Sequence, residues 1–78
     1  MLPIAVSQVR TSSDPEALYR AMMTLGNLLT IGKKVVQEAK ENYDAKKVVA
    51  EAVSRIDKNK EKRTVDIGVE IELLLAGN

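Results

Sequence analysis

The feature that most constrains this sequence is a capped amphipathic segment at residues 13–30. Ser13 or Asp14 can cap a helix there, and Pro15 fits the first helical turn, where no N–H is needed. Apolar residues recur at helical spacing and form one wide face: Leu18, Ala21, Met22, Leu25, Leu28 and Leu29. The segment is therefore expected to bury one side against other helices.

The opposite face of this helix carries different chemistry. At about 100° per residue, Glu16, Arg20, Met23, Thr24 and Asn27 point away from the apolar face. An arginine offers a planar fork of donors for carboxylates. An asparagine side chain can pair with the backbone of an extended peptide. Arg20, Thr24 and Asn27 are therefore candidates for binding a peptide, and the alternative is that they are ordinary solvent-exposed residues.

Three further segments show apolar residues at helical spacing, namely residues 2–10, 33–43 and 45–56. Each predicts a short amphipathic helix that can pack on the main one. In the last of these, Glu51 precedes Arg55 by four residues, which is the favourable order for an ion pair along a helix.

The breaks between these helices are also marked in the sequence. Gly32 is expected to terminate the main helix. Asp44 is expected to cap the helix that begins at residue 45. Residues 57–63 contain no apolar side chain and predict an exposed loop or first turn.

The C-terminal segment allows two interpretations. Residues 64–75 alternate apolar and polar side chains in the manner of a half-buried strand. No other segment is a suitable strand partner, however, and an isolated strand leaves its backbone groups unpaired. We therefore predict a helix, buried on most sides and ended by Gly77. The fold class expected is all-α, with four to five helices.

The composition removes most catalytic chemistry. The 78 residues form one domain at most and include no cysteine and no histidine, so a disulfide, a thiolate zinc site and the usual general base are excluded. The serines have no histidine to activate them: Ser7, Ser12, Ser13 and Ser54. Glu70 and Glu72 lie about 200° apart on a helix and cannot act as a carboxylate pair. We expect no catalytic residue, no metal and no cofactor.

The motif Gly32-Lys33-Lys34, which follows the main helix, opens the next helix and can attract an anion. It lacks the first glycine and the final serine or threonine of a phosphate-binding loop. We therefore interpret it as a helix boundary followed by solvated lysines.

The net charge of +1 is unevenly distributed. Residues 1–32 are balanced, residues 33–63 hold ten basic against six acidic side chains, and residues 64–78 hold three acids and no base. A basic middle is consistent with an acidic partner, although a solvated helical surface is the simpler explanation. No run approaches the roughly 18 apolar residues of a membrane span, and the start does not resemble a signal peptide. We expect a cytoplasmic or nuclear location.

Nucleic acid is an alternative partner, because basic residues are numerous in the middle of the chain: Lys33, Lys34, Lys46, Lys47, Lys58, Lys60, Lys62 and Arg63. Nucleic-acid binders commonly add aromatic side chains for stacking and have a higher isoelectric point than the 8.0 of this chain. The two tyrosines present both belong to helix patterns.

The order of the predicted helices resembles an armadillo repeat. Its third helix, which carries a peptide-binding asparagine, is followed by a short first helix, a second helix and the next third helix. Asn27 occupies the position of that asparagine. Met23, four residues earlier, stands where the family frequently has tryptophan.

A closer resemblance covers residues 14–29. Their run E-x-L-Y-R-x-x-x-x-L-G-x-L is similar to the last part of a PUL domain, the armadillo-like C-terminal domain of phospholipase-activating proteins and their fungal counterparts. PUL domains are several times longer than this chain. The resemblance therefore implies that residues 1–78 form a single module from the C-terminal part of a longer solenoid.

The resemblance also implies a function. In that family the domain is a non-catalytic adaptor whose basic groove binds the acidic C-terminal tail of an AAA ATPase, the valosin-containing protein, while other domains bind ubiquitin. Arg20 would be the groove arginine, with Asn27 beside it and with Thr24 and Met23 on the same face. In a solenoid each repeat covers the apolar face of its neighbour, so residues 2–9 are expected to cover part of the main helix. Self-association through exposed apolar faces is a further possibility, and a purely structural helical domain is the second hypothesis.

Overall fold

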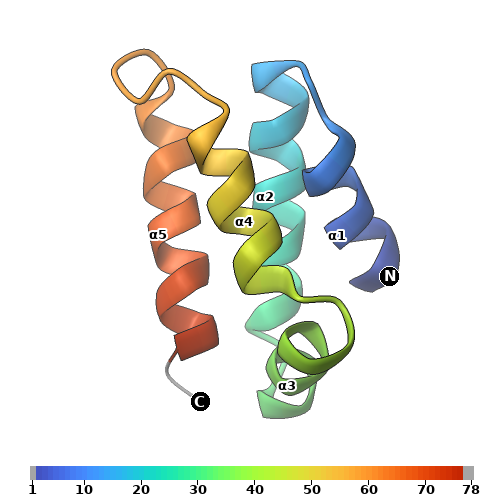
Figure 1. Ribbon diagram of the computed structural model, residues 1–78. Coiled ribbons are helices and arrows are strands. Elements are labelled where there is room, and N and C mark those ends of the chain that lie inside the picture. Colours follow the sequence, from blue (N-terminus) through green and yellow to red (C-terminus); the bar gives the residue numbers. More distant parts are fainter. Residues whose placement is uncertain (1, 77–78) are drawn as a thin grey trace.

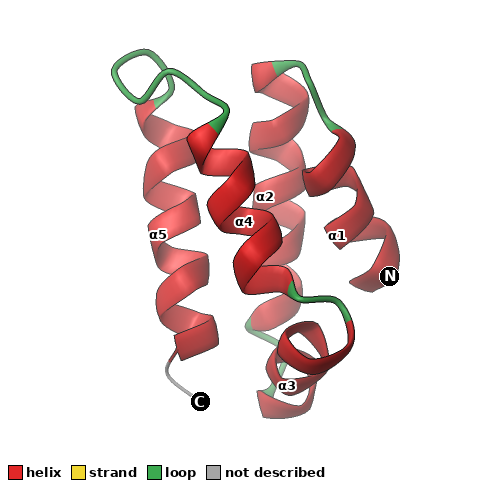
Figure 2. Ribbon diagram, in the orientation of Figure 1, coloured by secondary structure: helices red, strands yellow, loops and turns green. Residues whose placement is uncertain are grey.

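The computed structural model describes residues 2–76, which form five helices and no strand. The helices are α1 (Leu2–Thr11), α2 (Pro15–Leu29), α3 (Lys33–Asn42), α4 (Ala45–Ser54) and α5 (Lys62–Ala76) (Figure 1). Only short loops connect them, and the longest joins α4 to α5 (Figure 2). The all-α prediction is confirmed.

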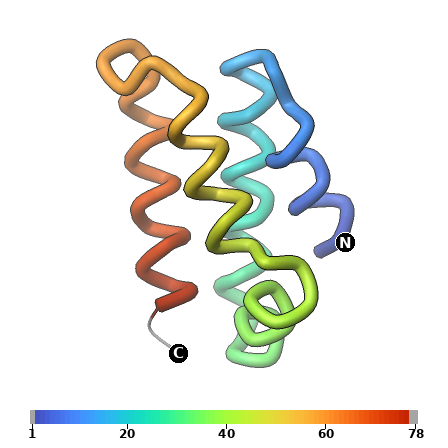
Figure 3. The backbone as a smooth tube through the Cα atoms, viewed as in Figure 1, coloured from blue at the N-terminus to red at the C-terminus, as the bar shows by residue number. Residues whose placement is uncertain are grey.

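Helix α2 lies at the centre of the packing. It contacts α1 and α5, and α4 contacts the same two helices, so these four form a closed ring. Helix α3 contacts α2, α4 and α5 and covers the end of the bundle opposite the α4–α5 loop (Figure 3). The ring encloses one aliphatic core in which Met22, Leu25 and Val49 are completely buried.

The start of α2 follows from its sequence. Asp14 has an extended backbone, and its side-chain Oδ2 accepts a hydrogen bond of 3.1 Å from the backbone N–H of Ala17. Of the two expected caps, Asp14 is therefore the one used, and Pro15 occupies the first turn as predicted. Five of the six expected apolar residues are buried, and Leu28 is half-buried.

The end of α2 differs from the prediction. The helix ends at Leu29, and Thr30 rather than Gly32 is its C-cap. The hydroxyl of Thr30 donates to the carbonyl of Asn27 at 2.7 Å, and the backbone N–H of Thr30 donates to the same carbonyl at 3.2 Å. Gly32 is extended and precedes α3. Thr30, two residues before Gly32, thus satisfies a carbonyl of the last turn and ends the helix there.

Asp44 precedes α4 as expected but does not cap it with its side chain. Its backbone is left-handed, with φ of 48° and ψ of 45°, and no side-chain capping hydrogen bond forms. Aspartate tolerates this conformation better than most residues. The residue therefore turns the chain between α3 and α4 rather than satisfying an N–H of α4.

Arg55 also departs from the prediction. It follows α4, and its guanidinium donates to the carbonyls of Val9 and Arg10 at 2.9 Å each, whereas no ion pair with Glu51 forms. These carbonyls belong to the last turn of α1, where a cation is favoured by the helix dipole. Arg55 thus joins α4 to the end of α1.

The C-terminal segment is a helix, so the strand alternative is wrong. Its burial is narrower than expected, because only Thr64, Gly68, Ile71 and Leu75 are buried. Val69 and Leu73 are 49% and 66% exposed, since α5 packs on α2, α3 and α4 with its other side only. The expected end of this helix at Gly77 lies outside the described residues.

The expectation for the N-terminal segment is confirmed. Helix α1 packs on α2 and buries Leu2, Ala5, Val6 and Val9. It therefore covers one flank of α2, and α5 covers the other.

Candidate functional site

The predicted binding residues lie together on the exposed side of α2. Arg20, Met23, Thr24 and Asn27 are all exposed, and we call them the outer face of α2. The buried residues of α2 point the other way, so the outer face has no role in the core. The prediction that these four side chains share one exposed face is consistent with the fold.

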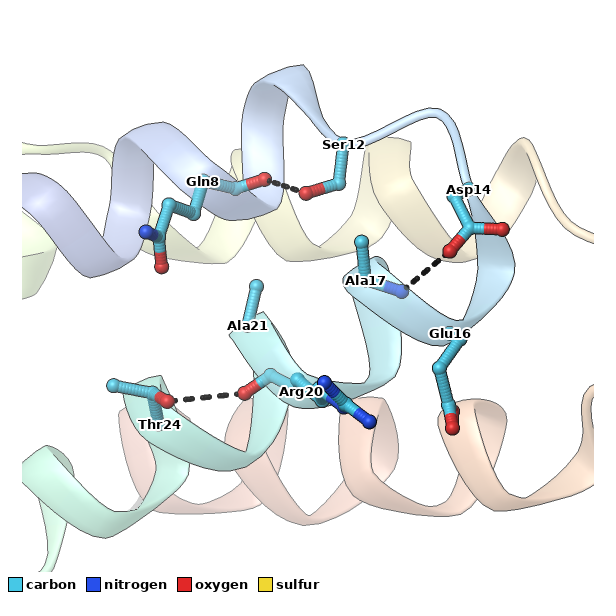
Figure 4. Close-up of a pocket in the computed structure, with 8 residues that line it drawn as sticks. All are labelled: Gln8, Ser12, Asp14, Glu16, Ala17, Arg20, Ala21 and Thr24. Carbon is cyan, nitrogen blue, oxygen red and sulfur yellow. Dashed lines mark hydrogen bonds between the residues drawn. The ribbon is translucent and has the colours of Figure 1, made fainter.

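A shallow groove runs between α1 and α2 beside this face, with a volume of about 370 Å³ (Figure 4). Arg20 and Thr24 line it from α2, Gln8 lines it from α1, and Ser12 lines it from the loop directly after α1. The hydroxyl of Thr24 donates to the carbonyl of Arg20 at 3.0 Å. This leaves the hydroxyl oxygen of Thr24 as an acceptor, while Arg20 and Gln8 provide side-chain donors.

A second groove lies on the opposite flank of α2, between α2 and α5, with a volume of about 190 Å³. Met23 and Asn27 line this groove, together with Leu74 and Glu70 of α5. It is more enclosed by apolar side chains than the first. The four predicted residues thus share a face but divide between two grooves, because α2 forms a ridge between α1 and α5.

The charged side chains that line the α1–α2 groove differ in whether another group of the protein already pairs with them. Asp14 and Glu16 line it as well as Arg20, so its formal charge is negative. Asp14 is held at the N-terminus of α2 by its hydrogen bond to Ala17. The carboxylate of Glu16 lies 3.7 Å from the Nη2 atom of Arg63 on α5. Within residues 2–76, no carboxylate lies within 4.0 Å of Arg20, so its guanidinium is the free charge of the groove.

The guanidinium of Arg63 contacts Tyr19 as well as Glu16. The guanidinium carbon lies 4.3 Å from the centroid of the Tyr19 ring, a cation–π geometry. Arg63 therefore contacts two residues of α2 that are one turn apart, Glu16 and Tyr19.

Sequence reasoning missed the contributions of α1 and α5 to this site. Gln8 lies on a helix that was expected only to cover α2, and Ser12, which follows that helix, was expected to have no role without a histidine to activate it. Arg63 was counted only among the basic residues of the middle segment. The polar positions of α1 that interrupt its apolar spacing were the available signal for Gln8. No local signal links residue 63 to residues 16 and 19.

The basic residues do not gather on one surface. Lys33 and Lys34 begin α3, whereas Lys58, Lys60 and Lys62 lie in and after the α4–α5 loop, at the opposite end of the bundle (Figure 1). This separation does not favour the single basic stripe of a nucleic-acid-binding domain.

The described part of the chain contains neither a membrane-spanning helix nor a cluster of metal-ligating side chains. No helix there has the length and apolar character required to cross a bilayer. No group of three or more acidic, cysteine or histidine side chains is placed to hold a metal ion within residues 2–76.

The fold and the two grooves define an all-α helical-repeat module with an exposed ridge helix. Comparison with protein families identifies the PUL domain, whose model matches residues 1–70. The chain therefore belongs to the PUL-domain family, and the match extends well beyond the residues 14–29 that carry the resemblance. PUL domains are protein-interaction domains. Neither a curated protein nor a solved structure shows significant similarity to the chain.

Proposed function

We propose that this module is a non-catalytic adaptor whose α2 outer face binds the acidic C-terminal tail of an AAA ATPase, the valosin-containing protein. The observation that carries the proposal is the free guanidinium of Arg20 beside an open groove, in a chain of the PUL-domain family. The adaptor would act in ubiquitin-dependent protein turnover, in the cytoplasm or nucleus, as part of a longer solenoid.

The geometry supports an extended peptide rather than a compact ligand. The α1–α2 groove follows α2 past Arg20 and Thr24, and Asn27 lies one turn further along the same helix, where it lines the α2–α5 groove, so a bound peptide would cross the outer face of α2. A carboxylate of the tail can accept hydrogen bonds from Arg20, and the side-chain amide of Asn27 can both donate to and accept from a peptide backbone. Met23 offers a flexible apolar contact between them.

The test is a binding titration with a fluorescein-labelled peptide of the ATPase tail, followed by fluorescence anisotropy. We expect Arg20→Gln to weaken binding about tenfold and Arg20→Glu to abolish it, because a charge-assisted hydrogen bond is replaced by a neutral one and then by repulsion. Arg10→Gln is the matched control, since it removes the same charge from α1 but lines a different groove, beside Arg55.

Two outcomes would contradict the proposal. The first is a wild-type module that does not bind the peptide. The second is equal binding by the wild type and Arg20→Glu, which would mean that any attraction is unrelated to the outer face. A scrambled peptide of the same composition separates recognition of the tail from attraction to charge alone.

Self-association is the second candidate function, because Ile31 and Leu73 are 70% and 66% exposed. Against it, Asp66 and Glu70 lie exposed on the same side of α5 as Leu73. Two copies that paired through this side would bring carboxylates together.

A further inference from the structure

The cluster of Arg63, Glu16 and Tyr19 lies beside the proposed binding site, and Glu16 is its one member that also lines the α1–α2 groove. Glu16 lines the α1–α2 groove, and its carboxylate would repel an acidic ligand. In the structure this carboxylate is paired with Arg63 at 3.7 Å, and Figure 4 shows the Glu16 side chain turned away from α1. We infer that Arg63 is a positioning residue, which masks Glu16 and thereby makes Arg20 available to an acidic peptide; this inference rests on the proposed function.

Helix geometry places Glu16 beside Arg20. Glu16 precedes Arg20 by four residues, so the two side chains are neighbours on α2 in the favourable order for an ion pair. No such pair forms, and no carboxylate of residues 2–76 lies within 4.0 Å of Arg20. Glu16 is instead directed to Arg63, from a different helix.

Two contacts hold Arg63 in place. An exposed ion pair alone is weak, and the side chains of Arg63 and Glu16 are 71% and 53% exposed. The Tyr19 ring, whose centroid is 4.3 Å from the guanidinium carbon, adds a second attraction and limits the rotamers of Arg63. Tyr19 and Glu16 are three residues apart on one side of α2, so one guanidinium can contact both.

The loss of Arg63 is expected to have two electrostatic effects on binding. Without Arg63, the Glu16 carboxylate is free both to pair with Arg20 and to repel the ligand. Each effect is modest at an exposed site, and together they are expected to weaken acidic-peptide binding about threefold to tenfold. Removing Glu16 as well would cancel both effects. Arg63 thus differs from a residue that touches the ligand, whose loss could not be repaired in this way.

The experiment uses the same labelled tail peptide and four variants of the chain. We expect Arg63→Gln to lower the affinity about threefold to tenfold at low salt, and Glu16→Gln/Arg63→Gln to restore the affinity of the wild type. Glu16→Gln alone should bind at least as tightly as the wild type. Lys62→Gln is the matched control, because it removes the same charge from the neighbouring exposed position and should change the affinity less than twofold.

A readout without peptide tests the cluster itself. In the free protein, the Arg63 side-chain protons should show an upfield ring-current shift in NMR spectra, which Tyr19→Leu removes. The Nε–H signal of Arg20 should move in Arg63→Gln and return toward its original position in the double variant, because Glu16 pairs with Arg20 only in the first. Circular dichroism of each variant checks that the helices remain formed.

The possible failures are distinguishable. If the wild type does not bind, or if Arg20→Glu binds equally well, the proposed function fails and this inference fails with it. If the wild type binds through Arg20 but Arg63→Gln binds as tightly, Arg63 has no positioning role. If the double variant remains as weak as Arg63→Gln, Arg63 contacts the peptide directly and masking is refuted.

Discussion

Two glycines on the helices around the core provide a paired test of the packing. Both Gly26 on α2 and Gly68 on α5 lie within helices, where alanine is intrinsically favoured by about 1 kcal/mol. A β-carbon added at Gly68 would lie 2.7 Å from Cγ2 of Val53 on α4. A β-carbon added at Gly26 would lie 3.6 Å from Cγ1 of Ile71, an ordinary contact. The two substitutions are therefore expected to have opposite signs.

The magnitude for Gly68→Ala is the difference between two terms. Optimal carbon–carbon separations are about 3.5–4.0 Å, and valine has little rotational freedom to yield. Overpacking of this kind costs about 1–3 kcal/mol, against a helix-propensity gain of about 1 kcal/mol. We expect a net loss of about 1 kcal/mol, which corresponds to a fall in Tm of about 4–8 °C for a domain of this size. Gly26→Ala should instead gain about 0.5–1 kcal/mol.

The assay is thermal and urea unfolding followed by circular dichroism at 222 nm. Val53→Ala removes the clashing methyl groups, so Gly68→Ala should become stabilising when it is introduced into that variant. If Gly68→Ala proves as stable as Gly26→Ala in the wild-type background, α4 and α5 do not approach as closely as described. If Val53→Ala fails to reverse its sign, the cost does not arise from Val53.

Two other substitutions test the remaining contacts. Arg55→Met should lower the free energy of unfolding by about 1–3 kcal/mol, because the carbonyls of Val9 and Arg10 lose their donor. Arg55→Lys cannot present the same fork of donors, so it should recover only part of this loss. If urea titrations show both variants to be as stable as the wild type, Arg55 does not cap α1. For self-association, we expect the wild type and Leu73→Gln to sediment alike as monomers at micromolar concentration in low salt, because carboxylates flank the exposed side chain of Leu73. A wild-type dimer that becomes monomeric in Leu73→Gln would favour the oligomerising function instead.

Much of the architecture was predictable because its causes are local. The apolar spacing of residues 15–29 and 45–54 requires one buried face whatever the partner helix is, and the Asp14–Pro15 pair marks a helix start by its own chemistry. The helix at residues 62–76 was predicted by exclusion, since no other segment could pair with it as a strand.

The predictions of helix ends and contacts were wrong where the sequence allows two different interactions at the same place. A threonine hydroxyl and a glycine can both end a helix, and the hydroxyl of Thr30 comes first in the chain. Arg55 can pair with Glu51 along its own helix or with carbonyls of α1, and only the approach of α1 makes the second available. The outer face of α5 was predicted to be buried because its apolar residues allow burial, yet no described helix covers it.

By itself, then, the sequence determined which side of α2 is buried and that Arg20, Met23, Thr24 and Asn27 share the exposed side, since a helix repeats about every 3.6 residues. Only the tertiary structure decided that α2 is a ridge between two grooves and that Arg63 of α5 reaches Glu16 on the adjacent helix α2. These features depend on contacts between residues far apart in the chain. Periodicity cannot encode them, because they depend on how the helices are placed against one another.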